Sequence, residues 1–277
     1  MQCATRGQNE GEKQLALLKG HSAPVNCVAW SSEHTCLSGS ADGTVRVWDV
    51  RSGRVARGLK CGRAVDMVVP DVSEGGHVLV LAACGRDVLA FDLRAPGVVL
   101  PCTHSAEAVA EDDIAQLAVN KRFVATCDDA GNVAVYEKRY GGPIAAAAAA
   151  ATTMMTPFKR MQRAHGGSIV ACVRFRPSRM YDVVTGGLDS KVVLWDASKG
   201  KKAWTLDLST AVIDGDNNDN ALGPMVNPPY ANDVAYSAAG DRLAVAAGSG
   251  DVFLVDAGKG TVLQRGSGGH SYSVASW

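Results

Sequence analysis

The chain carries no excess of charge of either sign. Its 277 residues hold 28 Lys and Arg side chains against 28 Asp and Glu, and no long block of one sign occurs. A neutral chain cannot neutralise phosphates over its whole surface, so we expect no direct binding of nucleic acid or anionic membranes unless the charges segregate. Aromatic residues are also few, at 6%, which predicts a core of Val, Ala and Leu.

Targeting and membrane-spanning signals are lacking as well. Residues 1–13 are polar with no apolar segment after them, and the longest apolar run, residues 144–155, is mostly alanine interrupted by two threonines. A span needs about 18 or more apolar residues, so none is expected. The eight cysteines form no Cys-x-x-Cys pair, which predicts reduced thiols and a cytoplasmic or nuclear location. Cys27 and Cys172 occupy matching places in two related segments, as small buried hydrophobic residues would.

Glycine, by contrast, is abundant at 30 of 277 residues, which predicts many tight turns and an all-β fold. Five apolar segments that end in an acid recur along the chain, at residues 45–49, 88–92, 133–137, 192–196 and 252–256. The acids lie 43, 45, 59 and 60 residues apart, so the first two intervals give the period. Low-complexity inserts at residues 141–157 and 209–226 account for the longer intervals. We expect a polar tail at residues 1–13 and a repeat domain over residues 14–277.

Within a repeat the apolar residues alternate with a period of two, which predicts strands. In the first good copy, residues 20–49, we expect strands at residues 25–30, 35–38 and 44–48, and a turn at residues 41–43. A fourth strand is expected before the next repeat. The second good copy spans residues 164–196.

The two copies resemble the WD40 repeat family. Gly20-His21 precedes a turn Asp42 and then Trp48-Asp49, and His165 precedes Asp189 and Trp195-Asp196 in the same way. The resemblance covers residues 14–277. It implies a β-propeller, with five complete four-stranded blades and the start of a sixth, in a family whose rings have seven.

The family resemblance also implies one buried hydrogen-bonded set of side chains in each good blade. The sets would be His21, Ser38, Asp42 and Trp48, and His165, Thr185, Asp189 and Trp195. In each set the Asp would accept from the His and from turn amides, which satisfies a carboxylate that is costly to bury. The weaker blades lack members of the set, because Val255 stands at the Trp position and no Gly-His opens the second blade. We expect those blades to rest on packing alone.

Catalytic and metal-binding alternatives are weaker. A Ser, His and Asp trio raises the possibility of a propeller hydrolase, but neither copy has a Gly-x-Ser-x-Gly elbow. Asp214, Asp216 and Asn218 have the spacing of calcium ligands, yet Asp219 stands where glycine is required and Met225 where the bidentate Glu belongs. We therefore expect no catalytic residue, no metal and no cofactor.

A closer resemblance is to WD40 proteins that serve as substrate receptors of cullin-4 RING ubiquitin ligases. It implies docking on the damaged-DNA-binding adaptor of the ligase through Asp-x-Arg motifs, with an unknown substrate protein as second partner. Two adjacent blades end in such motifs, Asp49-Val50-Arg51 and Asp92-Leu93-Arg94, whereas the third has Glu137. Residues two apart on an extended segment face the same side, so Asp49 is expected to hold Arg51 for pairing with a carboxylate of the adaptor.

Two other interpretations of the same residues stay open. Each arginine is equally well explained as a solvated turn residue, because an Asp after Trp belongs to the repeat itself. A propeller also binds peptides through whichever loops its faces carry. A generic peptide-binding scaffold would use the central mouth around His21, His165 and His270.

The ends of the repeat region predict an incomplete ring. Residues 14–18 are expected to form an outer strand that precedes the first blade, and Gly269-His270 opens a sixth repeat that reaches only Trp277. We expect the closing blades to be missing through truncation of the product or of the gene model. Open sheet edges and an exposed face between blades would then promote aggregation.

Overall fold

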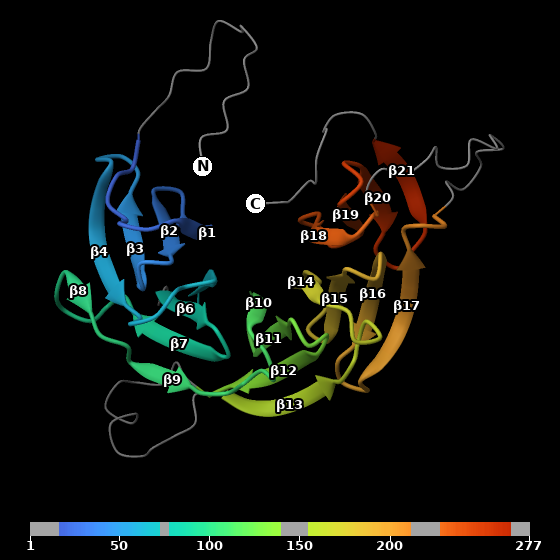
Figure 1. Cartoon of the computed structure of the whole chain (residues 1–277), viewed down its shortest axis with the longest axis horizontal. Coiled ribbons are helices and arrows are strands. Elements are labelled where there is room, and N and C mark those ends of the chain that lie inside the picture. Colours follow the sequence, from blue (N-terminus) through green and yellow to red (C-terminus); the bar gives the residue numbers. More distant parts are fainter. Residues whose placement is uncertain (1–16, 73–77, 140–154, 212–227, 267–277) are drawn as a thin grey trace, which may run out of the picture. The chain divides into compact units, whose positions relative to one another are not determined.

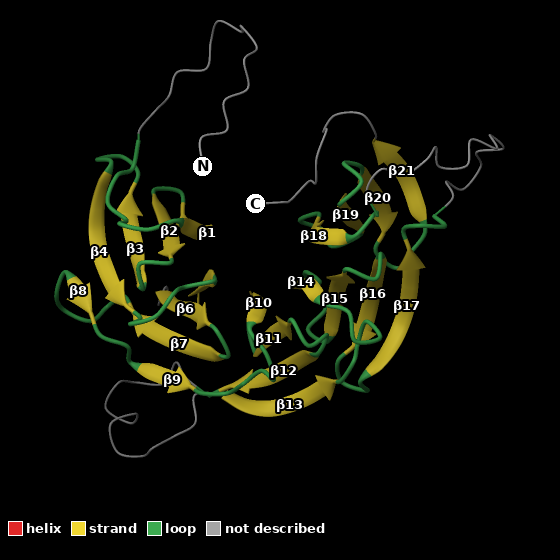
Figure 2. Cartoon of the chain, viewed as in Figure 1, coloured by secondary structure: helices red, strands yellow, loops and turns green. Residues whose placement is uncertain are grey.

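The computed structural model describes residues 17–72, 78–139, 155–211 and 228–266, which contain strands and no helix (Figure 1, Figure 2). The predicted all-β class is therefore confirmed. These ranges contain no helix that could cross a bilayer.

The strands form five sheets, which are antiparallel and follow one another along the chain except for the short strand β8 (Figure 1). The first contains β1 (Val25–Ser32), β2 (Thr35–Ser40), β3 (Thr44–Asp49) and β4 (Arg54–Lys60), with β8 (Val99–Leu100) parallel to β4. The second contains β5 (Met67–Val72), β6 (Val78–Cys84), β7 (Asp87–Asp92) and β9 (His104–Ala106). The third contains β10 (Ile114–Val119), β11 (Phe123–Asp128), β12 (Val133–Lys138) and β13 (Met155–Met161).

Two further four-stranded sheets complete the described chain. The fourth contains β14 (Val170–Phe175), β15 (Asp182–Gly187), β16 (Lys191–Asp196) and β17 (Lys201–Asp207). The fifth contains β18 (Ala231–Tyr236), β19 (Arg242–Ala247), β20 (Val252–Asp256) and β21 (Val262–Gly266). The predicted five blades of four strands are thus present, as expected for an incomplete β-propeller.

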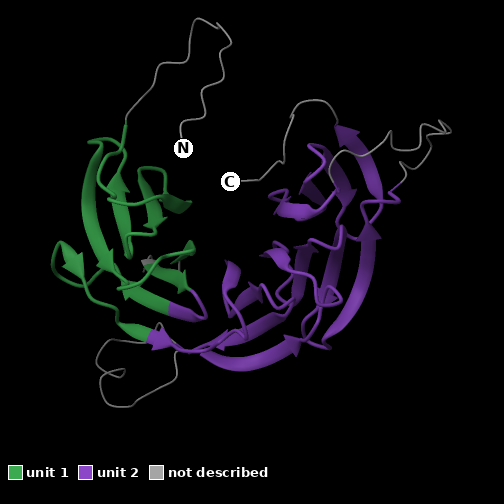
Figure 3. Cartoon of the chain, viewed as in Figure 1, with its two compact units in different colours: residues 1–84, 89–104 green, residues 85–88, 105–277 purple. Residues whose placement is uncertain are grey.

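The chain divides into two compact units (Figure 3). Unit 1 comprises residues 1–84 and 89–104, and unit 2 comprises residues 85–88 and 105–277. Within unit 1, an apolar core joins Leu37 and Val45 of the first sheet to Val68 and Val80 of the second. Within unit 2, one core joins the third and fourth sheets and another joins the fourth and fifth. Each core consists mainly of β-branched and small residues, as the scarcity of aromatics predicts.

A β-bulge recurs at the same place in the first strand of four sheets. The pairing register shifts between Val25 and Cys27, Ile114 and Gln116, Val170 and Cys172, and Ala231 and Asp233. A bulge turns the side chain that follows it and increases the local twist. Consequently Cys27 and Cys172 lie in the cores shared with the next sheet, at 7% and 0% exposure, as predicted for small buried hydrophobic residues.

The bulges also bring together a polar chain of three side chains in unit 2. Arg174 of β14 contacts the Gln116 carbonyl oxygen and lies 3.2 Å from Asp233 Oδ1. The Gln116 amide donates to the same Asp233 oxygen over 3.5 Å, and its carbonyl accepts the Val173 N–H at 2.8 Å. Side chains from the third, fourth and fifth sheets are therefore connected directly.

Some predicted boundaries are wrong. Residues 155–157, which we assigned to the first insert, begin β13, and Pro157 fits there because its place opposite Tyr136 is at a bulge. Leu17 and Leu18 form no strand, since no described strand pairs with them. The rest of that expected strand, His270 and most of both inserts lie outside the described residues.

Candidate interaction surfaces

The first sheet contains a continuous hydrogen-bonded set of side chains. His21 Nδ1 lies 2.8 Å from Asp42 Oδ2, and His21 Nε2 lies 2.7 Å from the Ser38 hydroxyl. The Trp48 indole N–H donates to the same hydroxyl at 2.8 Å. Because a carboxylate only accepts, Nδ1 carries the proton, and in the neutral ring Nε2 accepts from Ser38. The sequence pattern did not include Thr44, whose hydroxyl donates to Asp42 at 2.6 Å.

The fourth sheet repeats this arrangement closely. His165 lies 2.7 Å from Asp189 through Nδ1 and 2.8 Å from the Thr185 hydroxyl through Nε2. The Trp195 indole N–H donates to Thr185 at 2.9 Å. The structure thus brings all eight residues of the two expected sets together, four within each sheet.

Hydrogen bonding keeps both carboxylates charged. Burial opposes the charged form of Asp42, but donors from Thr44, His21 and the Ser22 N–H outweigh it and hold its pKa well below the usual range. Burial is also the largest single influence on the pKa of Asp189, and it raises that pKa. The hydrogen bonds from His165 and from the Lys191 N–H together outweigh it, so the pKa is lowered overall. The carboxylates therefore serve as internal acceptors.

The geometry of the Ser38 hydroxyl differs from that of a nucleophile. Ser38 is 5% exposed. Its oxygen lies between the His21 ring and the Trp48 indole, both within hydrogen-bond distance. An attacking hydroxyl needs an open approach for substrate beside its base, and the indole occupies that side. The set is built to link strands.

The third sheet satisfies its polar groups in another way. Tyr136 stands where Trp48 and Trp195 stand, and its hydroxyl donates to the Val109 carbonyl. Asp128 accepts the N–H groups of Asn132 and Glu111 at 2.8 and 3.2 Å. The expectation that the weaker blades rest on packing alone is wrong here, because backbone groups replace the missing histidine.

The fifth sheet also has polar contacts despite Val255 at the Trp position. Ser249 donates to Asp251 at 2.7 Å, and the Arg265 guanidinium lies 2.7 Å from the same carboxylate. The expectation that the weaker blades rest on packing alone is therefore wrong for this sheet too. A carboxylate near the β19–β20 turn can be satisfied by an arginine of the last strand as well as by a histidine.

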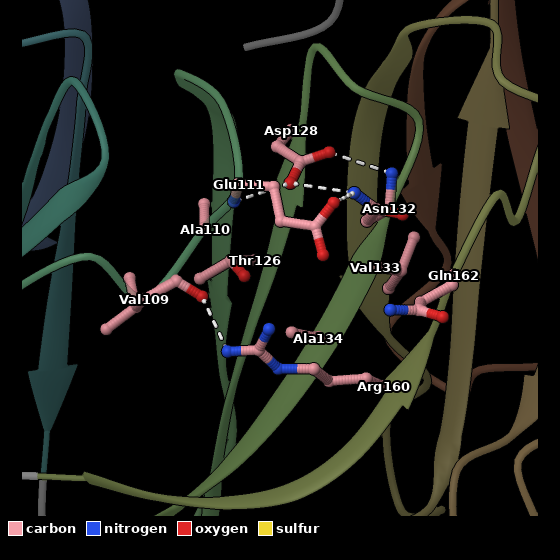
Figure 4. Close-up of a pocket in the computed structure, with 10 residues that line it drawn as sticks. All are labelled: Val109, Ala110, Glu111, Thr126, Asp128, Asn132, Val133, Ala134, Arg160 and Gln162. Carbon is pink, nitrogen blue, oxygen red and sulfur yellow. Dashed lines mark hydrogen bonds between the residues drawn. The ribbon is translucent and has the colours of Figure 1, made fainter.

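A small cavity lies beside the polar residues of the third sheet (Figure 4). It has a volume of about 10 Å³ and is lined by Val109, Glu111, Asp128 and Arg160 among others. Figure 4 shows Arg160 directed toward the Val109 carbonyl, to which it donates over 3.5 Å. The volume is near that of a single water and far below the roughly 300 Å³ of ligand pockets.

The first Asp-x-Arg motif is not paired as expected. Asp49 accepts the backbone N–H of Arg51 at 3.0 Å and the Ser52 hydroxyl at 2.9 Å. The Arg51 guanidinium instead contacts the His34 ring. The reason is local: the tight turn after β3 satisfies Asp49 with turn donors and directs the exposed Arg51 toward the β1–β2 turn.

The second motif has the paired geometry. Arg94 Nε lies 2.8 and 3.0 Å from the two Asp92 oxygens, and Nη2 lies 2.5 Å from Oδ2. This hydrogen bonding raises the pKa of Arg94. The Arg94 side chain is 35% exposed while that of Asp92 is 9% exposed. Asp92 thus positions an arginine that remains open to solvent.

The third sheet departs from the motif, as its sequence does. Glu137 pairs with Arg122 at 2.6 Å across the sheet, and Arg139 donates to the Thr156 hydroxyl at 3.2 Å. Glu137 and Arg139 are thus each engaged with another residue and not with one another. All seven described cysteines are free thiols, and the described residues include no group of three potential ligands that could hold a metal ion.

Comparisons with known proteins agree with the repeat pattern. Residues 12–49 and 157–196 match the family described as WD domain, G-beta repeat. These segments contain the two good copies.

Several curated proteins are similar in sequence to this chain. The chain is 23% identical over 250 residues to the WD repeat-containing protein 53 homolog of Dictyostelium discoideum, covering 86% of this chain and 63% of that protein. The order of the motifs along the chain predicts this resemblance, which is confirmed. The chain is also 35% identical over 99 residues to the ribosome biogenesis protein WDR12 homolog of Arabidopsis thaliana, covering 35% of this chain and 22% of that protein. The chain thus spans less than two thirds of either relative.

A solved structure shares the fold. The crystal structure of the computationally designed Ika8 protein superposes with a TM-score of 0.62 at 19% identity, covering 94% of this chain and 66% of that chain.

Proposed function

Because the chain carries WD40 repeats, we propose that it is a non-catalytic protein-interaction scaffold that acts as a substrate receptor of a cullin-4 RING ubiquitin ligase. The docking residues are Asp49, Arg51, Asp92 and Arg94, all in unit 1, and the partner is the damaged-DNA-binding adaptor. The observation that carries the proposal is the bidentate hold of Asp92 on a half-exposed Arg94.

Arg94 is prepared for recognition by this contact. A guanidinium has five N–H donors in a rigid fork, so the donors that Asp92 leaves unused can still meet a carboxylate of the adaptor. Fixing the side chain beforehand lowers the entropy that binding must cost. Arg51 has no such support from Asp49 and must leave His34 to act, so Arg94 is the stronger of the two.

Capture of the adaptor tests this proposal. We expect the Arg51→Ala/Arg94→Ala variant to capture the purified adaptor more than about tenfold less well than the wild type, since central arginines are typical binding hot spots. Arg94→Ala alone should account for most of the loss. The measurement is a pull-down with quantified bound adaptor.

The matched control is Lys19→Ala/Lys60→Ala, which removes the same charge from exposed positions elsewhere in unit 1. Capture by this control should equal that of the wild type. Undiminished capture by the Arg51 and Arg94 variant would overturn the docking proposal and leave only the scaffold function.

The central mouth around the histidines is a weaker candidate. His21 and His165 have side-chain exposures of 5% and 0%, and both rings are committed to the sets within their sheets. They position the turns near them and do not contact a peptide themselves.

A further inference from the structure

Five hairpin turns of unit 2, together with the end of β12, lie at one edge of its three sheets. Strands alternate in direction, so the turns β10–β11, β14–β15, β16–β17, β18–β19 and β20–β21 fall on the same side as the end of β12. Each turn or the residue that borders it has an exposed basic side chain, as does the end of β12, and six such residues define the basic edge: Arg122, Arg139, Arg179, Lys199, Arg242 and Lys259. Among the described residues of these turns, Asp241 is the one exposed acid.

The opposite edge of unit 2 has the reverse charge. The turns β11–β12, β15–β16 and β19–β20 contain Asp129, Asp189 and Asp251, and residues 111–113, Glu-Asp-Asp, lead into β10. Although the whole chain has no net charge, basic side chains therefore gather at one edge of unit 2 and acidic side chains at the other. Alternation of the strands produces this separation from a sequence without charge blocks.

Contacts between sheets hold the turns of the basic edge in fixed positions. Asn120 in the β10–β11 turn donates to the Met180 carbonyl in the β14–β15 turn at 2.9 Å. Arg176, at the end of the fourth sheet, donates to the Gly240 and Ala257 carbonyls at 2.7 and 3.3 Å. Neighbouring turns are thus fastened to one another, and the basic side chains project from a preorganised surface.

Most carboxylates on this edge accept hydrogen bonds from groups of their own turns. Asp196 accepts from Ser198 and Lys199, which lowers its pKa to about 2. Asp256 accepts the N–H groups of Gly258 and Lys259 at 2.8 and 2.9 Å. These acids leave a positive field, because Arg139, Arg179, Arg242 and Lys259 extend beyond them into solvent.

We propose that the basic edge of unit 2 binds an acidic segment of a partner polypeptide. This names the chemistry of one partner of the proposed scaffold and does not depend on adaptor docking, which uses unit 1. Turn carboxylates alternate with the basic side chains, so the edge suits an Asp- and Glu-rich chain with spaced charges better than a continuous polyphosphate. The aromatic rings nearby, Phe158 and Tyr181, pack on Phe123 with centroids 4.7 and 5.6 Å away. They are engaged with one another, whereas single-stranded nucleic acid stacks on free rings.

Fluorescence anisotropy with two probes of equal net charge tests the inference. The probes are a labelled peptide of repeating Glu-Ser and a labelled single-stranded oligouridylate. We expect the full chain to bind the peptide more tightly than the RNA, with affinity that falls as salt is added. Reversal of three charges, Arg179→Glu/Arg242→Glu/Lys259→Glu, should weaken peptide binding at least about tenfold, because three attractive contacts become repulsive.

Matched reversals in unit 1, Lys19→Glu/Arg54→Glu/Lys60→Glu, serve as the control and should leave peptide binding within about twofold of the wild type. Circular dichroism establishes that both variants are folded. Tighter binding of RNA, equal loss in both variants, or no binding of the peptide would each overturn the proposal. The adaptor pull-down is unaffected by any of these results, so the two proposals fail separately.

Discussion

The first and fourth sheets contain the same hydrogen-bonded set but differ in what covers them. Val28 and Val173 occupy the same register position, opposite Ser38 and Thr185 respectively, yet Val28 is 46% exposed and Val173 is fully buried. Trp30 is 65% exposed, whereas Phe175 at the equivalent position packs against the core of the third and fourth sheets.

The difference teaches that the set is a property of the sheet alone. Its hydrogen bonds have nearly the same lengths in both sheets, although the valine beside it is half exposed in the first sheet and buried in the fourth. The motif therefore stabilises one blade internally, and stability from contacts between blades is additional. Mutations in the two sheets can separate these contributions.

The largest effect is expected from Asp189→Ala. Loss of the carboxylate leaves the fully buried His165 ring without the acceptor of its Nδ1 proton, which should lower the free energy of unfolding by about 3 kcal/mol. Asp42→Ala should cost nearly as much, because that set is internal too. Guanidinium denaturation followed by tryptophan fluorescence measures both. Asp241→Ala is the exposed control, and a cost below about 1 kcal/mol for Asp189→Ala would contradict the internal set.

A smaller effect with sharper contrast is expected from the matched valines. Val173→Ala should lower the free energy of unfolding by about 2 kcal/mol, through lost burial and a residual cavity. Val28→Ala should cost less than about 0.5 kcal/mol because that side chain is half exposed. The same denaturation assay applies. Equal costs would mean that the first sheet is covered in solution as the fourth is.

The smallest effect is expected in the dependence of stability on pH. A carboxyl group whose pKa is lowered on folding stabilises the protein above its unfolded pKa of about 4, and the contribution is lost as pH falls toward the folded value. Asp42→Asn and Asp189→Asn should therefore flatten the loss of stability below about pH 4. The flattening should be greater for Asp42, which has the extra Thr44 donor. Denaturation midpoints across this range that run parallel to those of the wild type would contradict the assignment.

Much of the fold could be predicted because the sequence repeats its own local rules. A period of two, turn glycines and acids at strand ends located β3, β7, β16 and β20, and a His followed by a turn Asp and a Trp-Asp pair located both sets. These features act within one sheet. Local pattern is sufficient for them.

Features that depend on neighbouring chain segments could not be predicted. The contact of Arg51 with His34 arises because two turns meet at one edge of the first sheet. The place of Met155 in β13 depends on pairing with Lys138 and not on its own alanine-rich neighbourhood. The segregated charges of unit 2 appear only once alternate turns are assigned to opposite edges.

The polar chain of Gln116, Arg174 and Asp233 has a consequence for cooperativity. In a simple repeat protein each unit interacts with its nearest neighbours, and stability is close to a one-dimensional sum. Here Gln116 of the third sheet donates to Asp233 of the fifth. The stability of unit 2 therefore includes an interaction between sheets that are not nearest neighbours. The three sheets of unit 2 should consequently exchange their backbone amide protons in a single step, because opening any one sheet breaks its links to both of the others.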